Sequence, residues 1–198
     1  SSDLNIHLTK IQSESMNIPQ LIIESKSNDT DLESKLLEKV LIDAKTKYEI
    51  KGIVHGGILS EFQKKIFTNI CSNLQLEILS PLWKQDQKKY MNSLIDANFL
   101  FIIVSVTSSG LDESWLGKKI TKKDLLVLEN LASKHGFNLS FEGGEAETLV
   151  IDCPLFSYPI MSIAKWLGPM PTIVNAILIP MAAGPPMRRN GSASGMAG

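Results

Sequence analysis

The chain contains few cysteines and no long apolar stretch, and each shortage excludes a class of protein. Its 198 residues include two cysteines, Cys71 and Cys153, which lack the spaced partners of a zinc site or a disulfide framework. The most apolar region, residues 171–183, is interrupted by Asn175 and Pro180 and is shorter than the roughly 18 residues of a membrane span. We therefore expect a reduced, cytoplasmic protein that does not enter a membrane.

The sequence also lacks an excess of charge of either sign. The formal net charge is -1, so no overall basic field draws the chain toward DNA or anionic lipid. A group of lysines at residues 118–123 has the composition of an ordinary solvated face. The hydrophobic fraction of 43% is enough for a folded core, and 198 residues are enough for one α/β domain. Because the net charge is close to zero, we do not expect nucleic acid as a partner.

Helical and strand-like segments alternate along most of the chain. This alternation predicts an α/β fold with an open, mostly parallel sheet flanked by helices. Capping patterns begin helices at Ser60 and Thr121, and Gly136 stands where a helix commonly ends. The expected helices otherwise cover residues 3–16, 29–46 and 86–98, and the expected strands cover residues 20–24, 52–55, 76–79 and 99–104.

The pattern changes near residue 140. Short β-like runs at residues 148–152, 160–164 and 172–179 follow one another without a long helix. We therefore predict an α/β domain over residues 1–140 and a small β-rich lobe, mixed or antiparallel, over residues 141–181. The remaining residues, 182–198, lack periodicity and are predicted to form a disordered tail.

Three acidic side chains and two glycines are concentrated in residues 142–148, directly before a predicted strand. Glycine allows the backbone to approach a ligand closely, and Glu145 and Glu147 share a face if the chain is extended. Such a pair can hold Mg²⁺ through water, orient an amine or act as a base. The alternative is an acidic surface turn without chemistry.

A second polar segment, residues 110–117, follows the apolar strand 99–104. Ligands of open α/β sheets bind beyond the carboxyl ends of the strands, so this position favours a substrate site. The alternative is that Asp112 and Ser114 make local turn bonds while Trp115 packs beneath the loop.

A third segment, residues 54–61, leads from a strand through two glycines to a helix start. Backbone N–H groups at such a position bind anions, which suggests a nucleotide contact. The spacing does not match a dinucleotide fingerprint, and a single histidine such as His55 is more often structural than catalytic.

Taken together, these segments resemble the diphthine–ammonia ligase family of ATP pyrophosphatases. The resemblance rests on residues 56–64, 81–87, 110–117 and 142–156, in this order and spacing, and covers roughly residues 3–165. It implies the last step of diphthamide formation, in which ATP activates the carboxylate of diphthine on elongation factor 2. Ammonium then supplies the amide nitrogen, and AMP and pyrophosphate are released, with Mg²⁺ offsetting the phosphate charge.

The resemblance assigns roles to residues in all three segments. It implies that the catalytic residues are Glu142, Glu145, Glu147 and Thr148. The nucleotide is expected at His55, Gly56, Gly57 and Glu61. The substrate is expected at Gly110, Asp112, Glu113, Ser114, Trp115, Gly143 and Gly144, and no protein ligand is assigned to a metal.

The sequence departs from the family pattern in three places. The family begins with a strand and a Ser-Gly-Gly-Lys-Asp-Ser loop that wraps pyrophosphate, whereas this sequence starts about where the second helix would begin. We expect such a chain to be a fragment with impaired activity, to bind ATP weakly alone and to self-associate. Phe141 and Cys153 each stand where the family has glycine, which concerns only local backbone shape.

Two other functions fit the same residues. One is a non-catalytic, nucleotide-responsive or interaction domain of the same fold, and the other is a related ATP pyrophosphatase with a different carboxylate substrate. A coding sequence for Ser-Gly-Gly-Lys-Asp-Ser upstream of Ser1 would argue against the non-catalytic domain. Conversion of ATP to AMP with and without elongation factor 2 separates the related pyrophosphatase from diphthine amidation. A homo-oligomer is a further open alternative. No Cys/His arrangement of a glutaminase is present, so free ammonium is the simpler nitrogen donor.

Overall fold

The computed structural model describes residues 2–23, 29–160 and 176–178 of the chain. Helices alternate with strands, and no barrel closes among these residues, so the predicted α/β class is confirmed. The elements are α1 (Ser2–Met16), β1 (Gln20–Ile22), α2 (Thr30–Tyr48), β2 (Gly52–Val54), α3 (Glu61–Asn73), β3 (Glu77–Leu79), α4 (Gln87–Asp96), β4 (Leu100–Val106), the 3₁₀ turn η1 (Glu113–Trp115), α5 (Lys122–His135), β5 (Ala146–Asp152) and β6 (Ala176–Leu178).

The strands pair as three two-stranded ladders. β2 and β3 are parallel, as the alternation of helix and strand predicts, and Ile53 lies opposite Ile78. β4 and β5 are antiparallel, with Ile103 opposite Thr148, and β1 and β6 are also antiparallel. β5 therefore pairs across the boundary predicted at residue 140, and the division into two domains stays a prediction. The predicted tail, residues 182–198, and much of the predicted lobe lie outside the described residues.

Local capping explains where several helices begin and end. The Thr121 hydroxyl accepts from the backbone N–H of Asp124, whose carboxylate accepts in return from Thr121, so the predicted capping box is present. Gly136 ends α5 with φ +76°, a left-handed conformation that glycine adopts without a side-chain clash. At α3, the Ser60 hydroxyl accepts from the N–H of Gln63 at 3.3 Å. The sequence signals for these ends are confirmed.

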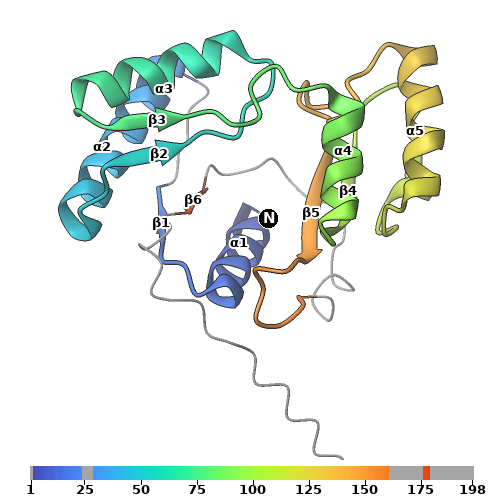
Figure 1. Cartoon of the computed structure of the whole chain (residues 1–198), viewed down its shortest axis with the longest axis horizontal. Helices are drawn as coiled ribbons and strands as arrows, with labels where there is room; N and C mark the ends of the chain where they lie inside the picture. The colour runs from blue at the N-terminus through green and yellow to red at the C-terminus, as the bar shows by residue number, and fades with distance from the viewer. Residues whose placement is uncertain (1, 24–28, 161–175, 179–198) are drawn as a thin grey trace, which may run out of the picture.

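Buried apolar side chains form three clusters, and Figure 1 shows how the elements carrying them are arranged. One cluster lies among α2, β2, α3 and β3, which gather on one side of the view. A second lies between β4 and the helices α4 and α5 on the other side. The third packs α1 against β4, β5 and the segment that follows β5.

One apolar side chain differs from the expected helix face. The spacing of residues 62–74 places Phe62 inward with Ile66 and Ile70, but Phe62 is 60% exposed. It belongs to the first turn of α3, and the cluster beneath this helix includes Ile66 and Ile70 but not Phe62. The prediction for Phe62 was therefore wrong, whereas the remainder of the apolar face is partly or fully buried.

Neither cysteine is paired, and both thiols are buried. Burial raises the pKa of the Cys71 thiol, which makes it a poor nucleophile. Within the described residues, no helix is both long and apolar enough to cross a bilayer.

Candidate functional site

The acidic segment forms a tight turn between α5 and β5. Phe141 has φ +59° and Gly144 has φ +81°, so the backbone enters the left-handed region on both sides of Glu142 and Gly143. Phe141 is 6% exposed, and its ring stacks against Phe137 at 6.2 Å between centroids. Burial of this ring therefore accompanies a backbone conformation that bulky residues rarely adopt.

Glu145 holds this turn together. Its Oε1 accepts from the backbone N–H of Asn138 at 2.9 Å and from Asn138 Nδ2 at 2.8 Å, and its Oε2 accepts from the N–H of Gly143 at 2.8 Å. Burial acts to raise the pKa of Glu145, but these hydrogen bonds outweigh it and lower the pKa below its ordinary value. Both carboxylate oxygens are thus engaged inside the loop.

Gly143 fits this arrangement because it has no side chain. A Cβ at this position would lie 2.6 Å from Glu145 Oε1 and 2.9 Å from Asn138 Nδ2. Gly143 and Gly144 were predicted to bind substrate, and in the structure Gly143 allows the carboxylate to fold back on its own turn. The substrate contact stays a prediction.

Glu142 points to a different part of the chain. Its Oε1 accepts a short hydrogen bond from the N–H of Ile58, and its Oε2 accepts from the N–H of Leu59 at 2.8 Å. These two donors follow Gly56 and Gly57, in the segment predicted to contact nucleotide. The structure thus brings the first and third predicted site segments together through one carboxylate.

Glu147 and Thr148 occupy the first half of β5. Glu147 lies opposite Ser105 of β4 and is half-buried, and burial raises the pKa of its carboxyl group. Among the described residues no hydrogen bond or ion pair engages this carboxylate. Thr148 is exposed on the adjoining position of the strand. Glu147 is therefore the carboxylate of this segment that is left for a ligand or a proton.

His55 and the two glycines form the nucleotide-side segment. His55 is 6% exposed, its ring lies 4.4 Å from that of Phe67, and its Nδ1 has no partner in the described structure. Burial lowers the pKa of the imidazole, as does nearby Lys64, while the Glu142 carboxylate acts in the opposite direction. His55 is therefore held as a neutral ring beside Glu142.

The two glycines differ in what surrounds them. A Cβ on Gly57 would lie 2.3 Å from Cε1 of the His55 ring, so a side chain there is excluded by the protein itself. A Cβ on Gly56 would meet nothing within 4 Å. Gly56 is thus the position where the backbone stays open to an approaching molecule.

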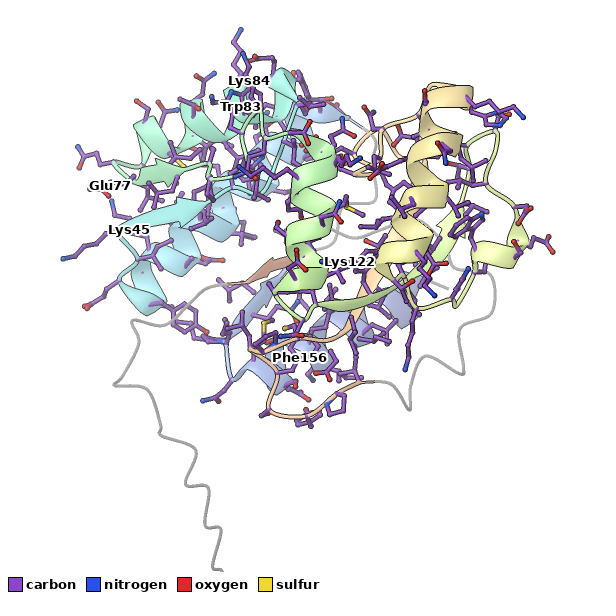
Figure 2. The ribbon with its side chains drawn as sticks, turned by 45° about the vertical axis from the view of Figure 1, so that its right-hand side comes forward. Lys45, Glu77, Trp83, Lys84, Lys122 and Phe156 are labelled. Carbon is purple, nitrogen blue, oxygen red and sulfur yellow. The ribbon has the colours of Figure 1, made fainter. Side chains whose placement is uncertain are left out.

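Positive charge gathers beside the start of α3. Lys64 Nζ lies 4.1 Å from the centre of the Trp83 ring and Lys84 Nζ lies 5.8 Å from it, as favourable cation–π contacts require. Figure 2 shows Trp83 and Lys84 side by side at the same end of the molecule. Lys84 also lies 3.7 Å from the carboxylate of Glu61, an exposed pair of little energetic weight. Glu61, predicted to contact nucleotide, is thus engaged with a lysine.

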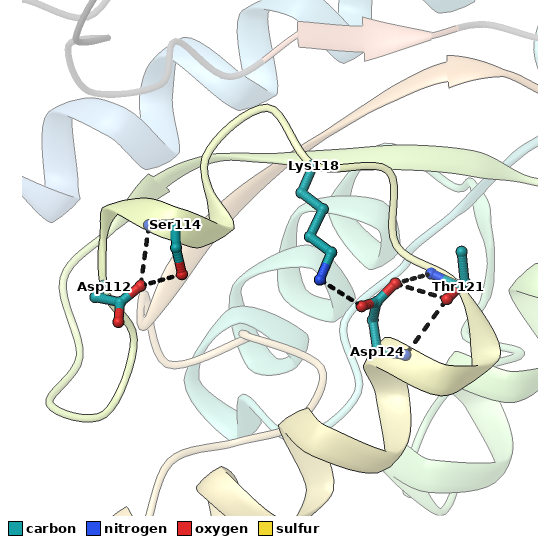
Figure 3. Close-up of polar contacts among 5 residues, drawn as sticks. All are labelled: Asp112, Ser114, Lys118, Thr121 and Asp124. Carbon is teal, nitrogen blue, oxygen red and sulfur yellow. Dashed lines mark hydrogen bonds and ion pairs between the residues drawn. The ribbon is translucent and has the colours of Figure 1, made fainter.

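The second predicted segment, residues 110–117, is held by local contacts. The Asp112 carboxylate accepts from the backbone N–H of Ser114 at 2.9 Å and from its hydroxyl, and both bonds lower the pKa of Asp112 (Figure 3). Trp115 is 7% exposed in the cluster between β4 and the helices, while Glu113 is exposed. These contacts match the structural alternative weighed from the sequence.

The remaining contacts of this segment are also internal. Gly110 has φ +94°, and a Cβ there would lie 2.4 Å from the His135 ring. Lys118 contacts the Trp115 ring and pairs with Asp124 at 2.6 Å (Figure 3). Leu111 and Trp115 share one buried cluster with Phe141 and Ala146, so the segment packs against residues at both ends of the acidic turn. Its predicted substrate contacts stay predictions.

Sequence reasoning missed three polar residues around the acidic turn. Asn138 donates twice to Glu145, and its own Oδ1 accepts from Gln87 Nε2 at 3.2 Å. Gln87 Oε1 in turn accepts from the N–H of Ser140 at 3.1 Å. The backbone N–H of Thr107, beyond β4, donates to the Glu145 carbonyl at 3.0 Å. Gln87 lies within the resembling segment 81–87, but no local pattern marks it as a support for the turn.

The site contains no protein cage for a metal among the residues that the structure covers. No three His, Cys, Asp or Glu side chains converge there as a ligand set. The oxygens of Glu142 and Glu145 are already accepting hydrogen bonds. A cation at this place would need oxygens from a bound molecule in addition to a free carboxylate.

Two protein-family models match most of the chain, including the segments described above. The family model described as the diphthamide synthase N-terminal domain matches residues 2–78, and the one described as the diphthamide synthase C-terminal domain matches residues 86–166. Both the β2–α3 segment and the acidic turn therefore fall within matched regions.

Curated relatives named diphthine–ammonia ligase occur in several animals. The bovine protein is 35% identical over 166 residues, with 78% of this chain and 62% of the relative covered. The human protein is 32% identical over 159 residues, covering 80% and 58% respectively, and the mouse protein is 38% identical over 126 residues, covering 63% and 47%. The chain thus spans about half to three fifths of the length of these relatives.

Proposed function

Since the chain belongs to the diphthamide synthase family, we propose that its protein carries out the ATP-dependent amidation of diphthine on elongation factor 2. The proposal places the reaction in the cytoplasm, with ammonium as the nitrogen donor and AMP and pyrophosphate as products. The observation that carries it is the contact of Glu142 with Ile58 and Leu59, which brings a nucleotide-type segment and an acidic segment into one site.

The residues of the third segment fit an anionic nucleotide. The N–H groups of Ile58 and Leu59, which follow Gly56 and Gly57, already donate to the Glu142 carboxylate, so this stretch of backbone suits a negatively charged group. Gly56 leaves the backbone open, the His55 Nδ1 is without a partner in the described chain, and Lys64 adds positive charge nearby. We assign ATP to this segment, where it would supply the leaving group that a carboxylate lacks.

Mg²⁺ is part of the proposal, and no particular side chain is assigned to it as a ligand. Phosphates carry several charges, and a divalent cation offsets them most effectively when it bridges their oxygens. Magnesium commonly keeps waters and takes one or two carboxylates in addition to phosphates, rather than a full protein cage.

Glu147 is proposed to serve the nitrogen donor. Its carboxylate is half-buried and unengaged within the described structure, and burial raises its pKa. A carboxylate of this kind attracts ammonium and accepts the proton that ammonium must lose before nitrogen can attack the activated carbonyl. Glu145, whose oxygens are occupied, is proposed to shape the turn that presents Glu147.

The decisive experiment uses protein expressed from the complete coding sequence. It is incubated with elongation factor 2 carrying diphthine, ATP, Mg²⁺ and ammonium, and the carboxyl-to-amide mass change is followed together with AMP formation. We expect both products to depend on all four components. AMP formation that does not require elongation factor 2 would instead indicate a different carboxylate substrate, and no AMP formation would indicate a non-catalytic domain.

A further inference from the structure

The carboxylate of Glu142 differs from those of Glu145 and Glu147 because its hydrogen-bond donors lie outside the acidic turn. Its two acceptors engage backbone donors 84 and 83 positions away in the sequence. The carboxylate of Glu145, by contrast, engages donors only two and seven positions away. Glu142 is therefore the carboxylate that fixes the acidic turn relative to another part of the fold.

The two donors stand at a place that favours a carboxylate. Ile58 and Leu59 directly precede Ser60, the N-cap of α3, so a carboxylate bound to their N–H groups lies near the positive end of the helix dipole. Bonds between an ionised carboxylate and such donors are roughly twice as strong as bonds between neutral groups. Ile58 is 3% exposed, and its carbonyl accepts from the N–H of Lys84 at 2.9 Å, so the donor segment is itself held in place.

Hydrogen bonds within the acidic turn connect Glu142 to the start of β5. Glu145 ties Gly143 and Asn138 together, and its carbonyl accepts from the N–H groups of Thr107 and Ser108 at 3.0 and 3.1 Å. Glu147 lies two residues farther along, opposite Ser105. The path from Ile58 to Glu147 thus runs through short, hydrogen-bonded backbone.

We propose that Glu142 is a positioning residue that sets the separation between the nucleotide-side segment 55–61 and Glu147. The proposal rests on the proposed function, because it assigns these two parts to opposite reactants of one reaction. Groups that face Glu142 from neighbouring elements are His55, which follows β2, and Tyr90 of α4, and its charge acts on both. Loss of its two hydrogen bonds would let the two parts of the site move apart, and displacement by about 1 Å can lower a rate by roughly 100-fold.

Amide hydrogen exchange tests the contact directly and needs no activity. Glu142→Gln keeps the shape of the side chain but leaves one oxygen acceptor and places an NH₂ group against the second donor. We expect exchange at Ile58 and Leu59 to accelerate by about 10-fold or more, in keeping with the strength of charged hydrogen bonds. Glu33→Gln, an exposed glutamate in the first turn of α2, is the matched control and should leave this exchange unchanged.

Kinetics on the protein from its complete coding sequence test the positioning role. In Glu142→Gln we expect kcat for amidation to fall by about 10- to 100-fold, while KM for ATP stays within about twofold of the parent. Glu142→Asp keeps the charge but is one methylene shorter, and should retain part of the exchange protection and part of kcat. The two quantities should fall together across the three proteins.

The outcomes separate this proposal from the proposed function. Retained protection at Ile58 and Leu59 in Glu142→Gln would overturn the contact, and unchanged kcat or a KM for ATP that rises with the fall in kcat would overturn the positioning role. If the parent itself does not amidate elongation factor 2, the proposed function fails, whereas the exchange measurement still decides whether Glu142 holds the two segments together.

Discussion

At the scale of single residues, the three glutamates of residues 142–147 have identical side chains but different hydrogen-bond partners. Glu142 accepts from a distant segment, Glu145 accepts from its own turn, and Glu147 is left unengaged within the described residues. Their spacing in the sequence predicts a functional cluster but not this division. The difference depends on Asn138, Ile58 and Leu59, whose positions follow only from the folded chain.

Replacement of Glu147 by Gln should separate activity from stability. Because burial raises the pKa of this carboxyl group, ionisation disfavours the folded state, and the variant should melt at the same or a higher temperature at pH 7. The stability difference from the parent should vanish below the ordinary glutamate pKa of about 4.3 and grow as the pH rises above it. Amidation should fall by about 100-fold or more if the residue accepts a proton.

These two measurements identify the role of Glu147 jointly. Turnover of the parent should fall with decreasing pH through a pKa above that of an ordinary glutamate, and this limb should be absent from the residual activity of the variant. Turnover within about twofold of the parent, less than roughly 0.4 kcal/mol, would remove Glu147 from the reaction.

Replacement of Glu145 by Gln should have the opposite effect on stability. The hydrogen bonds that lower its pKa stabilise the fold above the unfolded-state pKa of about 4.3, and this contribution is lost as the pH falls through the lower folded-state value. We expect a loss of about 1–3 kcal/mol at pH 7 in denaturant unfolding. The deficit should shrink below pH of about 4, and a constant deficit across that range would contradict the assignment.

At the scale of elements, the ends of helices and strands decide where the site residues stand. β2 ends at Val54, after which His55, Gly56 and Gly57 lead to the N-cap of α3. The N–H of His55 still donates to the Leu79 carbonyl at 2.8 Å, so the parallel pairing continues past the end of the strand and orients the imidazole. The sequence predicts this strand, turn and helix because each depends on neighbouring residues.

Substitution of the two glycines distinguishes shape from ligand contact. Gly57→Ala brings a Cβ against a buried imidazole that packs on Phe67, and should cost about 1–3 kcal/mol in unfolding free energy. Gly56→Val meets open space and should leave the melting temperature near that of the parent, while weakening ATP binding in calorimetric titration. Unchanged ATP affinity in Gly56→Val would place the nucleotide elsewhere.

Pairing between distant elements could be predicted only in part. The apolar run of β4 is typical of a strand buried in a parallel sheet, yet its described partner is the antiparallel β5. One face of β4 packs on α4 and α5 and the other on α1, and its parallel contact within the described residues is a single isolated bridge from Ile103 to Leu116. A run of apolar residues indicates burial on two sides but does not specify the direction of the partner strand.

At the scale of the whole molecule, α1 joins the start of the chain to the segment after β5. The hydroxyl of Ser15 donates to the Tyr158 carbonyl at 2.6 Å and accepts from the Tyr158 N–H at 3.2 Å. The Ser15 carbonyl accepts from Ser157 through both its N–H and its hydroxyl, each at 2.7 Å. Gln12 adds a bond to the Val150 carbonyl at 2.8 Å, so α1 fastens both β5 and the residues beyond it.

Ser15→Ala tests this attachment. The hydroxyl is buried with its residue 1% exposed, and its removal leaves the N–H and carbonyl of Tyr158 without their partner. We expect a loss of about 1–3 kcal/mol in unfolding free energy. Ser34→Ala, which removes a bond within the exposed side of α2, is the control and should change stability by less than about 0.5 kcal/mol.

The three ladders differ in how far apart their strands lie along the chain, and this sets an order of assembly. β2 and β3 are separated by one helix, whereas β4 and β5 are separated by η1, α5 and the acidic turn. Leu21 of β1 pairs with Ile177 of β6, so this ladder closes a loop that includes almost all other elements. Loop-closure entropy must be overcome before distant contacts stabilise the chain. Among the described residues β6 is the strand that pairs with β1. During synthesis on the ribosome β1 therefore emerges long before this partner, whereas β2 and β3 can already pair.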